Sequence, residues 1–213
     1  ATMGKGRIDG RIQLGTLPLS MLASFGAPQL TGTAKGDLKL TGTTSKPAVT
    51  LALNLDGVKP GDPFYAKKPG FGADIDAKID SGRMALDVSV DGMSPEPGKI
   101  TLTIPLKLTL EPFAFDLASN APLDGKVNAK LDMGQLSLLA SLNGQRVSGI
   151  IDVDLAIGGR LDRPLLDGSM ILDNGQFLDA ASGFALVNTR MRLEAKGQSI
   201  NIAKLEATDG ATG

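Results

Sequence analysis

The 213-residue chain contains no histidine, no cysteine and no tryptophan. It therefore lacks the side chains of a Cys or His nucleophile, of a Ser-His-Asp triad and of an ordinary zinc site. We expect a protein that is not an enzyme and holds no metal or cofactor. The absence of cysteine does not decide the cellular compartment, because a periplasmic or secreted protein without disulfides and a cytosolic protein can both lack cysteine.

Aromatic residues make up only 4% of the chain, and 22 basic residues face 23 acidic ones. The charges are scattered, whereas phosphate binding needs a clustered basic surface. The scarcity of aromatic rings also removes the usual platforms for stacking bases. Both features argue against a nucleic-acid partner.

Long apolar runs are missing too, since none approaches the roughly 18–20 residues that a membrane helix needs. The sequence shows no signal peptide. Because it begins and ends within patterned sequence, we expect a fragment of a longer protein that carries its targeting information elsewhere.

What fills the chain is alternation of aliphatic and polar residues, clearest in Ser148–Gly175. There, every second residue from Ile151 to Ile157 is aliphatic, and Gly158-Gly159 ends this first run. A second extended run, Gly168–Leu172, ends at the turn residues Asp173-Asn174-Gly175. The same period appears in 48–55, 74–80, 83–90 and 99–110. This pattern predicts half-buried strands with one apolar and one polar face.

Three segments depart from this period. Pro105 predicts a bend, a bulge or an edge position, because proline cannot donate to a ladder. The segment Leu17–Phe25 is predicted to be a short helix, since Pro18 suits a first turn and Gly26 a helix end. Val58–Gly72 is predicted to be a loop.

An internal repeat relates two parts of the sequence. Gly6–Pro47 aligns with Gly125–Pro164, at a shift of 119 residues at the start and 117 at the end. Gly-rich alternating strands can align by chance, but both copies hold a predicted helix at the same place. We therefore divide the chain into a first repeat, residues 1–118, and a second, residues 119–213, within one continuous structure.

The predicted fold is all-β. About fifteen short strands and two short helices leave nothing to cover a broad apolar sheet face, and open sheets beyond about ten strands twist, curl or split. We expect a long, curled, antiparallel-rich sheet folded on itself as a taco-like open groove. A dry sandwich core made of the same aliphatic residues is the alternative.

The apolar positions of these strands are the candidate site, as the aliphatic wall of the groove. Leu, Ile, Val and Met dominate this face, which suits acyl chains. The predicted lining residues are Val49, Leu51, Leu53, Leu55, Ile75, Ile79, Met84, Leu86, Val88, Ile100, Leu102, Ile104, Leu106, Leu108, Ile151, Val153, Leu155, Met170, Met191 and Leu193.

Other candidates are weaker. The carboxylates of Asp152, Asp154, Asp162, Asp167 and Asp173 cluster in sequence, but their spacing does not match a calcium loop and the first two fall on a polar face. Glycine pairs such as Gly158-Gly159 lack the following helix of a phosphate site and are predicted turns.

A further candidate lies in the predicted loop. Lys67 and Lys68 stand close in sequence to Phe64, Tyr65 and Phe71. They could touch lipid headgroups at the mouth of a groove. A solvated loop explains them as well.

The strand-and-turn motif of the second repeat resembles the TamB family of the AsmA-like superfamily. It reads GRLDRPLLDGSMILDNGQF in Gly159–Phe177, and more loosely GTTSKPAVTLALNLDGV in Gly42–Val58, where Thr50-Leu51 replace Asp167-Gly168. The resemblance implies the periplasmic part of an inner-membrane-anchored protein in a diderm bacterium. It also implies phospholipid acyl chains as cargo and a TamA-like outer-membrane barrel as partner.

The resemblance thus implies a periplasm-spanning segment that carries phospholipids along an aliphatic groove and supports outer-membrane biogenesis. A second hypothesis is an assembly module whose edge strands pair with outer-membrane proteins or autotransporters by β-augmentation. A β-helix adhesin is a third, but β-helices repeat every twenty-odd residues.

Overall fold

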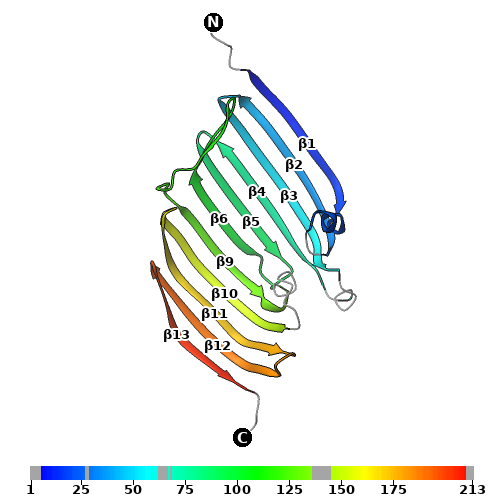
Figure 1. Cartoon of the computed structure of the whole chain (residues 1–213), viewed down its shortest axis with the longest axis vertical. Helices are drawn as coiled ribbons and strands as arrows, with labels where there is room; N and C mark the ends of the chain where they lie inside the picture. Colours follow the sequence, from blue (N-terminus) through cyan, green and yellow to red (C-terminus); the bar gives the residue numbers. More distant parts are fainter. Residues whose placement is uncertain (1–5, 27–28, 62–66, 68, 136–144, 210–213) are drawn as a thin grey trace.

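The computed structural model describes residues 6–26, 29–61, 67, 69–135 and 145–209. They form one curved antiparallel sheet of eleven strands, to which a two-stranded hairpin and short helical segments are attached (Figure 1). The predicted all-β, antiparallel sheet is confirmed. The sheet runs without interruption across residue 118, so the division into two repeats remains a prediction.

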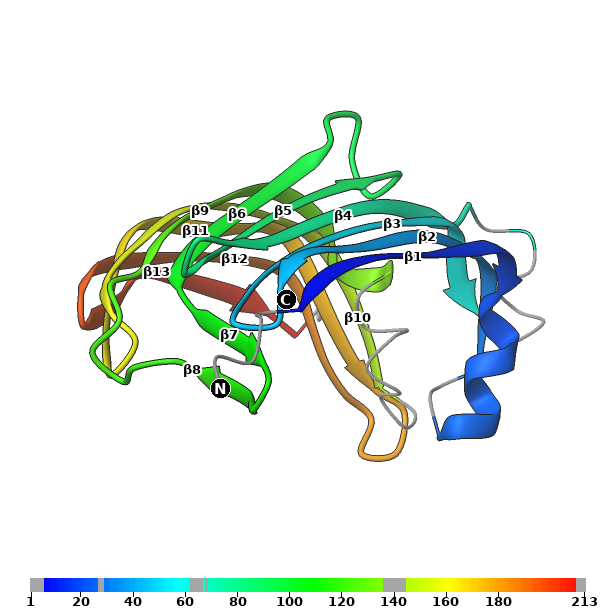
Figure 2. The ribbon, with the colours of Figure 1, turned by 90° about the horizontal axis from the view of Figure 1, so that it is seen from above.

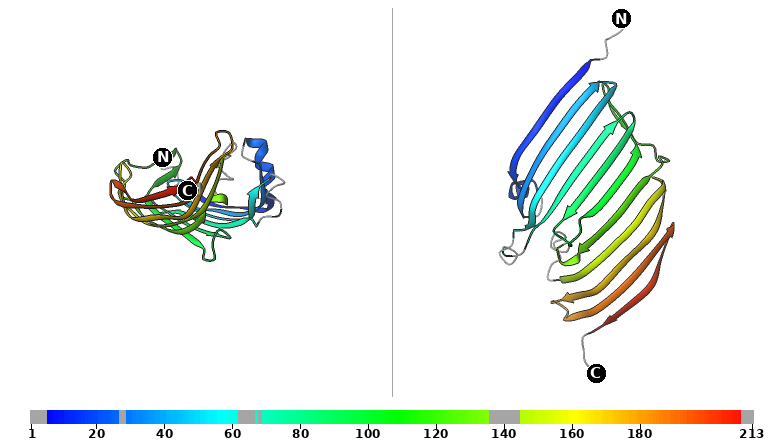
Figure 3. Two further views of the ribbon diagram at one scale, coloured as in Figure 1. Left: turned by 90° about the horizontal axis from the view of Figure 1, so that it is seen from below. Right: turned by 180° about the vertical axis from the view of Figure 1, so that it is seen from behind.

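Neighbouring strands of the sheet are mostly consecutive in sequence. In spatial order they are β1 (Arg7–Pro18), β2 (Leu30–Thr43), β3 (Lys46–Pro60), β4 (Phe71–Asp80), β5 (Arg83–Asp91), β6 (Gly98–Pro105), β9 (Asp124–Asp132), β10 (Gln145–Arg160), β11 (Arg163–Asp179), β12 (Phe184–Gly197) and β13 (Ser199–Thr208). The edge strands β1 and β13 lie at opposite ends of the sheet (Figure 3).

The strand predicted over 99–110 is interrupted after Pro105. β6 ends there, and β7 (Lys107–Leu110) pairs with β8 (Phe113–Asp116) in a separate hairpin. The broken ladder at proline was expected. The departure of the chain from the sheet was not, because it depends on backbone contacts at neighbouring turns that a local pattern does not contain.

Helix and loop boundaries also differ from the predictions. Leu17 and Pro18 belong to β1, and the helix η1 is a 3₁₀ helix over Leu19–Phe25. Residues 133–135 begin a helix in the second repeat, and the rest of that predicted helix lies outside the described residues. The loop predicted from Val58 is shorter, because Val58 pairs with Phe71 in the β3–β4 ladder.

Bulges bend the strands. Register shifts occur between Leu14 and Leu17, Leu55 and Val58, and Ser148 and Ile150, all in the half of the strand farthest from the β2–β3 turn. A bulge adds one residue to one strand, which bends that strand and increases its twist. The sheet accordingly forms an arch (Figure 2).

The two faces of the arch differ in chemistry. Figure 2 places the β7–β8 hairpin and η1 on the concave side, and the loop between β5 and β6 on the convex side. Glu96 of that loop borders a shallow depression that is also lined by Lys130, Asp152 and Asp154. The polar face of the sheet is therefore convex, and the aliphatic residues that alternate with it face the concave side.

Few side chains are fully buried. Among the described residues the buried hydrophobic positions are Leu19, Val58, Ala73, Met93, Ile104, Leu106, Ala121, Ala129, Val153, Leu155 and Ala195. Most other aliphatic residues of the concave side are half-buried, since the only second sheet in the described part of the chain is the two-stranded β7–β8 hairpin at one end of the strands.

Candidate functional site

The candidate site is the apolar face, defined here as the aliphatic and glycine positions on the concave side of the eleven strands. Cross-strand pairing aligns these positions in rows that run across the whole sheet. One unbroken row joins Leu14, Gly36, Leu53, Ile75, Val88, Ile100, Val127, Leu155, Gly168, Ala195 and Ile200.

Adjacent rows have the same character. Leu55 pairs with Ala73 and Ala73 with Val90, while Val153 pairs with Met170 and Met170 with Leu193. Successive residues of a strand point to opposite faces, so correct register keeps every member on one side. The apolar face is therefore continuous from β1 to β13.

The structure brings the predicted lining residues together, with two exceptions. Every one of them except Leu106 and Leu108 lies on the apolar face of the sheet. Leu106 follows the end of β6 and is only 1% exposed, and Leu108 belongs to β7 in the hairpin. These two residues belong to the hairpin segment rather than to the wall of the sheet.

Sequence reasoning missed further members at the edges and in the middle of the sheet. They are Ile12, Leu14, Leu38, Leu40, Val127, Leu131, Ile200, Ile202 and Leu205. Their alternation was readable in the sequence. Exposure rises toward the edges, to 46% for Leu14 and 64% for Ile202, because a neighbouring strand is present on one side only.

The hairpin lies at the end of the sheet that carries the β2–β3 and β4–β5 turns. The Leu106 N–H donates to the carbonyl of Gly82 at 2.9 Å, and the Leu110 N–H donates to the carbonyl of Thr44 at 2.7 Å. Beyond it, the Leu123 N–H donates to the carbonyl of Gly159. Backbone bonds to three turns thus fix the segment along this end of the strands.

The clustered aspartates do not converge on a site. Asp152 lies on the convex face, 3.7 Å from Lys130, and Asp162 pairs with Arg160 at 2.9 Å. Within the described part of the chain, no group of three acidic, His or Cys side chains could hold a metal ion. We therefore interpret these carboxylates as solvated surface charges, two of which form ion pairs.

The predicted headgroup contact near Lys67 falls largely outside the described residues. Phe64, Tyr65 and Lys68 lie outside them, and Lys67 is an exposed turn residue. Phe71 begins β4 opposite Val58.

Two carboxylates away from the apolar face have perturbed acidity. The Arg11 guanidinium, 2.7 Å from Asp37, lowers the pKa of that carboxyl. Hydrogen bonds from the Ser182 hydroxyl and the Ala181 N–H lower the pKa of Asp179. The Asp37 contact joins strands β1 and β2, and the Asp179 hydrogen bonds lie within the β11–β12 turn.

Comparisons with family models, curated proteins and solved structures found no match. No helix among the described residues is long and apolar enough to cross a membrane. No polar side chain is buried in the described part of the chain, so this face can hold hydrocarbon by the hydrophobic effect, at about 25 cal/mol per Å² removed from water.

Proposed function

We propose that the chain is a segment of a periplasmic bridge that carries phospholipids along its apolar face between the inner and outer membranes. One observation carries this proposal, the unbroken row from Leu14 to Ile200, beside which the described part of the chain places only the β7–β8 hairpin and η1 on the concave side. Eleven strands spaced at about 4.8 Å give a path of roughly 48 Å. The TamB-like motif supports the same function, with an inner-membrane anchor and a TamA-like barrel acting through the parent protein.

Transport along such a path needs no reactive group. A fully buried methylene gains about 0.8 kcal/mol, and one covered on a single side gains roughly half of that. Aliphatic side chains and glycines along each row offer similar contacts at every strand. Cargo can then slide without meeting a deep pocket, which is the property that a conduit requires.

The test places a charge on the apolar face, at Leu53 in the row that runs across the sheet. Protein purified without detergent is examined by native mass spectrometry for bound phospholipid, and by lipid photocrosslinking. We expect the wild type to carry phospholipid and Leu53→Lys to lose most of it, since the ammonium would have to be desolvated beneath the acyl chains. Ala52→Lys, on the polar face of the same strand, should bind as the wild type does.

Two results would contradict this function. A wild-type protein free of lipid by mass would count against it directly. Global unfolding of Leu53→Lys, with Ala52→Lys stable, would favour a dry core instead.

A second candidate function rests on the open edges. All residues of β13 are exposed, and its outer edge has no partner strand among the described residues. An extended segment of an outer-membrane protein could pair there by β-augmentation. Capture of such a peptide that survives Leu53→Lys but is lost in Ile202→Pro would favour this alternative.

A further inference from the structure

Large apolar side chains are exposed together at the β1 edge of the sheet. Three belong to β1 and two to η1, which directly follows β1. They are between 42% and 58% exposed and are called the edge patch here: Ile12, Leu14, Leu17, Met21 and Leu22. Single exposed apolar residues are ordinary, whereas a contiguous group marks contact with a membrane or a partner.

The register of β1 keeps the strand residues of the edge patch on the concave side. Leu14 lies opposite Gly36, a position of the apolar face. Leu17 is three positions further on and would otherwise point to the other face. The bulge between them adds one residue to β1, so that Leu17 lies opposite Ala34, the partner of Leu55. η1 also lies on the concave side (Figure 2).

The edge patch is continuous with the apolar face. A Cβ placed on Gly36 would lie 3.3 Å from Leu14 Cδ1 and 3.4 Å from Leu53 Cδ1, so the two leucine side chains converge above this glycine. Leu53 is the next member of the row that crosses the sheet. An acyl chain that arrives at the edge patch therefore reaches this row without passing a polar side chain.

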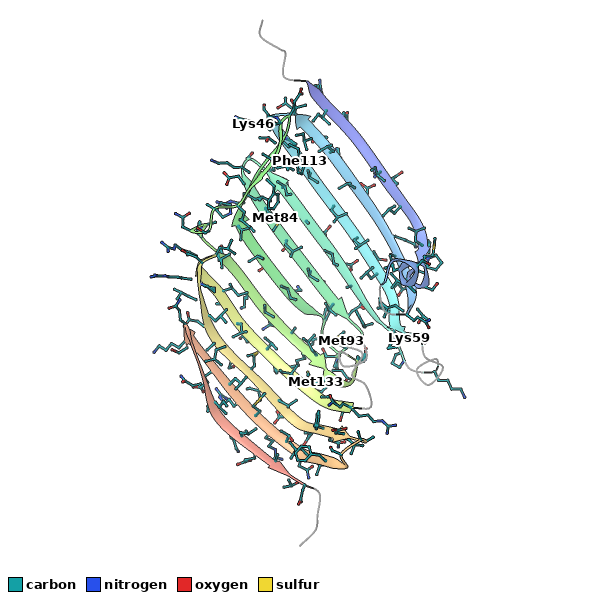
Figure 4. All side chains as sticks on the ribbon, viewed as in Figure 1. Lys46, Lys59, Met84, Met93, Phe113 and Met133 are labelled. Carbon is teal, nitrogen blue, oxygen red and sulfur yellow. The ribbon has the colours of Figure 1, made fainter. Side chains whose placement is uncertain are left out.

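The edge patch lies away from the β7–β8 hairpin and is open on its outer side. Figure 4 shows η1 at the end of the strands that carries Lys59, whereas Lys46 and Phe113 mark the opposite end. Among the described residues, no strand pairs with the outer edge of β1. A partner can therefore approach the edge patch directly.

The chemistry around the edge patch favours an uncharged, apolar partner. Residues 12–34 form the longest stretch of the chain without a charged side chain. Arg11, which precedes this stretch, lies on the polar face and pairs with Asp37 at 2.7 Å. Insertion of the edge patch into hydrocarbon would therefore desolvate no ionised group of its own.

The opposite edge of the sheet differs in this respect. Ile200 and Ile202 of β13 are exposed as well, but Lys204 and Glu206 follow them on the same strand. Insertion at that edge would bring an ammonium and a carboxylate close to hydrocarbon, which is costly. The two edges are therefore not equivalent as contacts for a lipid surface.

We propose that the edge patch docks on a lipid surface by shallow insertion, and that lipids pass there between the membrane and the apolar face. The inference rests on the proposed function and assigns it an exchange site. Met21 and Leu22 of η1 are the inserted side chains, and Leu17 and Leu14 lead to the row. Because the contact is apolar, it depends on buried area rather than on headgroup charge.

The first test measures co-flotation of the protein with phosphatidylcholine vesicles. Met21→Glu/Leu22→Glu should lower the vesicle-bound fraction by roughly tenfold or more, because two apolar side chains are lost from the contact. The matched variant Ile200→Glu/Ile202→Glu, at the opposite edge, should bind as the wild type does. Binding should persist at about 0.5 M salt, which screens exposed charges.

A second measurement uses the absence of cysteine, which makes an introduced thiol unique. Met21→Cys, labelled with an environment-sensitive dye, should show blue-shifted emission when vesicles are added. Gln13→Cys, on the polar face of β1, is the control and should not. Circular dichroism should show the variants folded, since the changed side chains are exposed. If the double variant lost its fold, Met21→Gln alone should still lower the bound fraction.

The outcomes separate docking from transport. Equal flotation of the two edge variants, an unshifted dye at Met21, or loss of binding in salt would overturn the docking site. So would oligomers of the wild type that do not float and that Met21→Glu/Leu22→Glu dissociates, because the edge patch would then be a protein interface. Leu53→Lys should still float while carrying little lipid. Flotation of a wild type that carries no lipid when re-isolated would overturn the conduit but not the docking surface.

Discussion

Gly168 lies directly opposite Leu155 in the β10–β11 ladder, and a side chain at this position would collide with the backbone of Asp154 and Leu155. Its φ of 140° lies in a region that other residues rarely adopt. The glycine therefore lets the two longest strands, β10 and β11, pair closely within the apolar face.

Gly168→Ala should reduce the free energy of unfolding by about 1–3 kcal/mol, because the methyl group forces the ladder apart in a strained backbone conformation. The measurement is the urea midpoint. Gly158→Ala, ten residues earlier in β10, is the matched control, since nothing lies within 4 Å of its added Cβ. Equal destabilisation by both changes would contradict the steric argument.

Leu106→Ala should destabilise the attachment of the hairpin by roughly 2–5 kcal/mol, the usual loss for a buried leucine. Leu106 is the largest fully buried side chain of the described residues. Thermal unfolding and amide hydrogen exchange of β7 and β8 measure the effect. Phe115→Ala, at an exposed position of the same hairpin, should change stability by less than about 0.5 kcal/mol. Unchanged exchange in Leu106→Ala would show that the backbone bonds alone hold the hairpin.

The Arg11–Asp37 contact between β1 and β2 predicts a pH-dependent stability. The pKa of Asp37 is lowered in the folded protein, so the contact stabilises above the ordinary pKa of an aspartate and is lost as the pH falls through the lowered value. The stability difference between wild type and Asp37→Asn should therefore be larger at about pH 7 than at about pH 2. Asp9→Asn, on the edge strand β1 that also carries Arg11, is the control.

NMR titration of the Asp37 carboxyl gives an independent measurement of this contact. An Arg11→Gln variant should move that pKa back toward its ordinary range, because the guanidinium is its main cause. A titration unaffected by Arg11→Gln would contradict the assignment.

The strands and their faces could be predicted because alternation is a local property. From Val49 to Leu55 and from Ile151 to Leu155, each aliphatic residue lies on the face that its position in the period requires. Register then follows, because a slip of one residue would expose the whole apolar set. Missed members such as Val127 and Ile202 had the same pattern over shorter or bulged segments.

The position of the β7–β8 hairpin could not be predicted from alternation. Leu106 and Leu108 continue the alternation of β6 in sequence, yet Leu106 bonds to Gly82 of the β4–β5 turn, and Leu110 of the same hairpin bonds to Thr44 of the β2–β3 turn. Those contacts join residues some 25 to 65 positions apart in the chain, which no local window contains. Pro105 marked the break but not the direction of the chain after it.

The sequence by itself determined the all-β class, the two chemically different faces and the membership of most of the apolar face, because side-chain direction alternates strictly along a strand. Only the tertiary structure decided where and how strongly the sheet bends, since bulges in neighbouring strands add to one common bend. It also decided that the β7–β8 hairpin leaves the sheet and lies along the β2–β3 and β4–β5 turns, because backbone bonds from Leu106 and Leu110 reach residues distant in sequence.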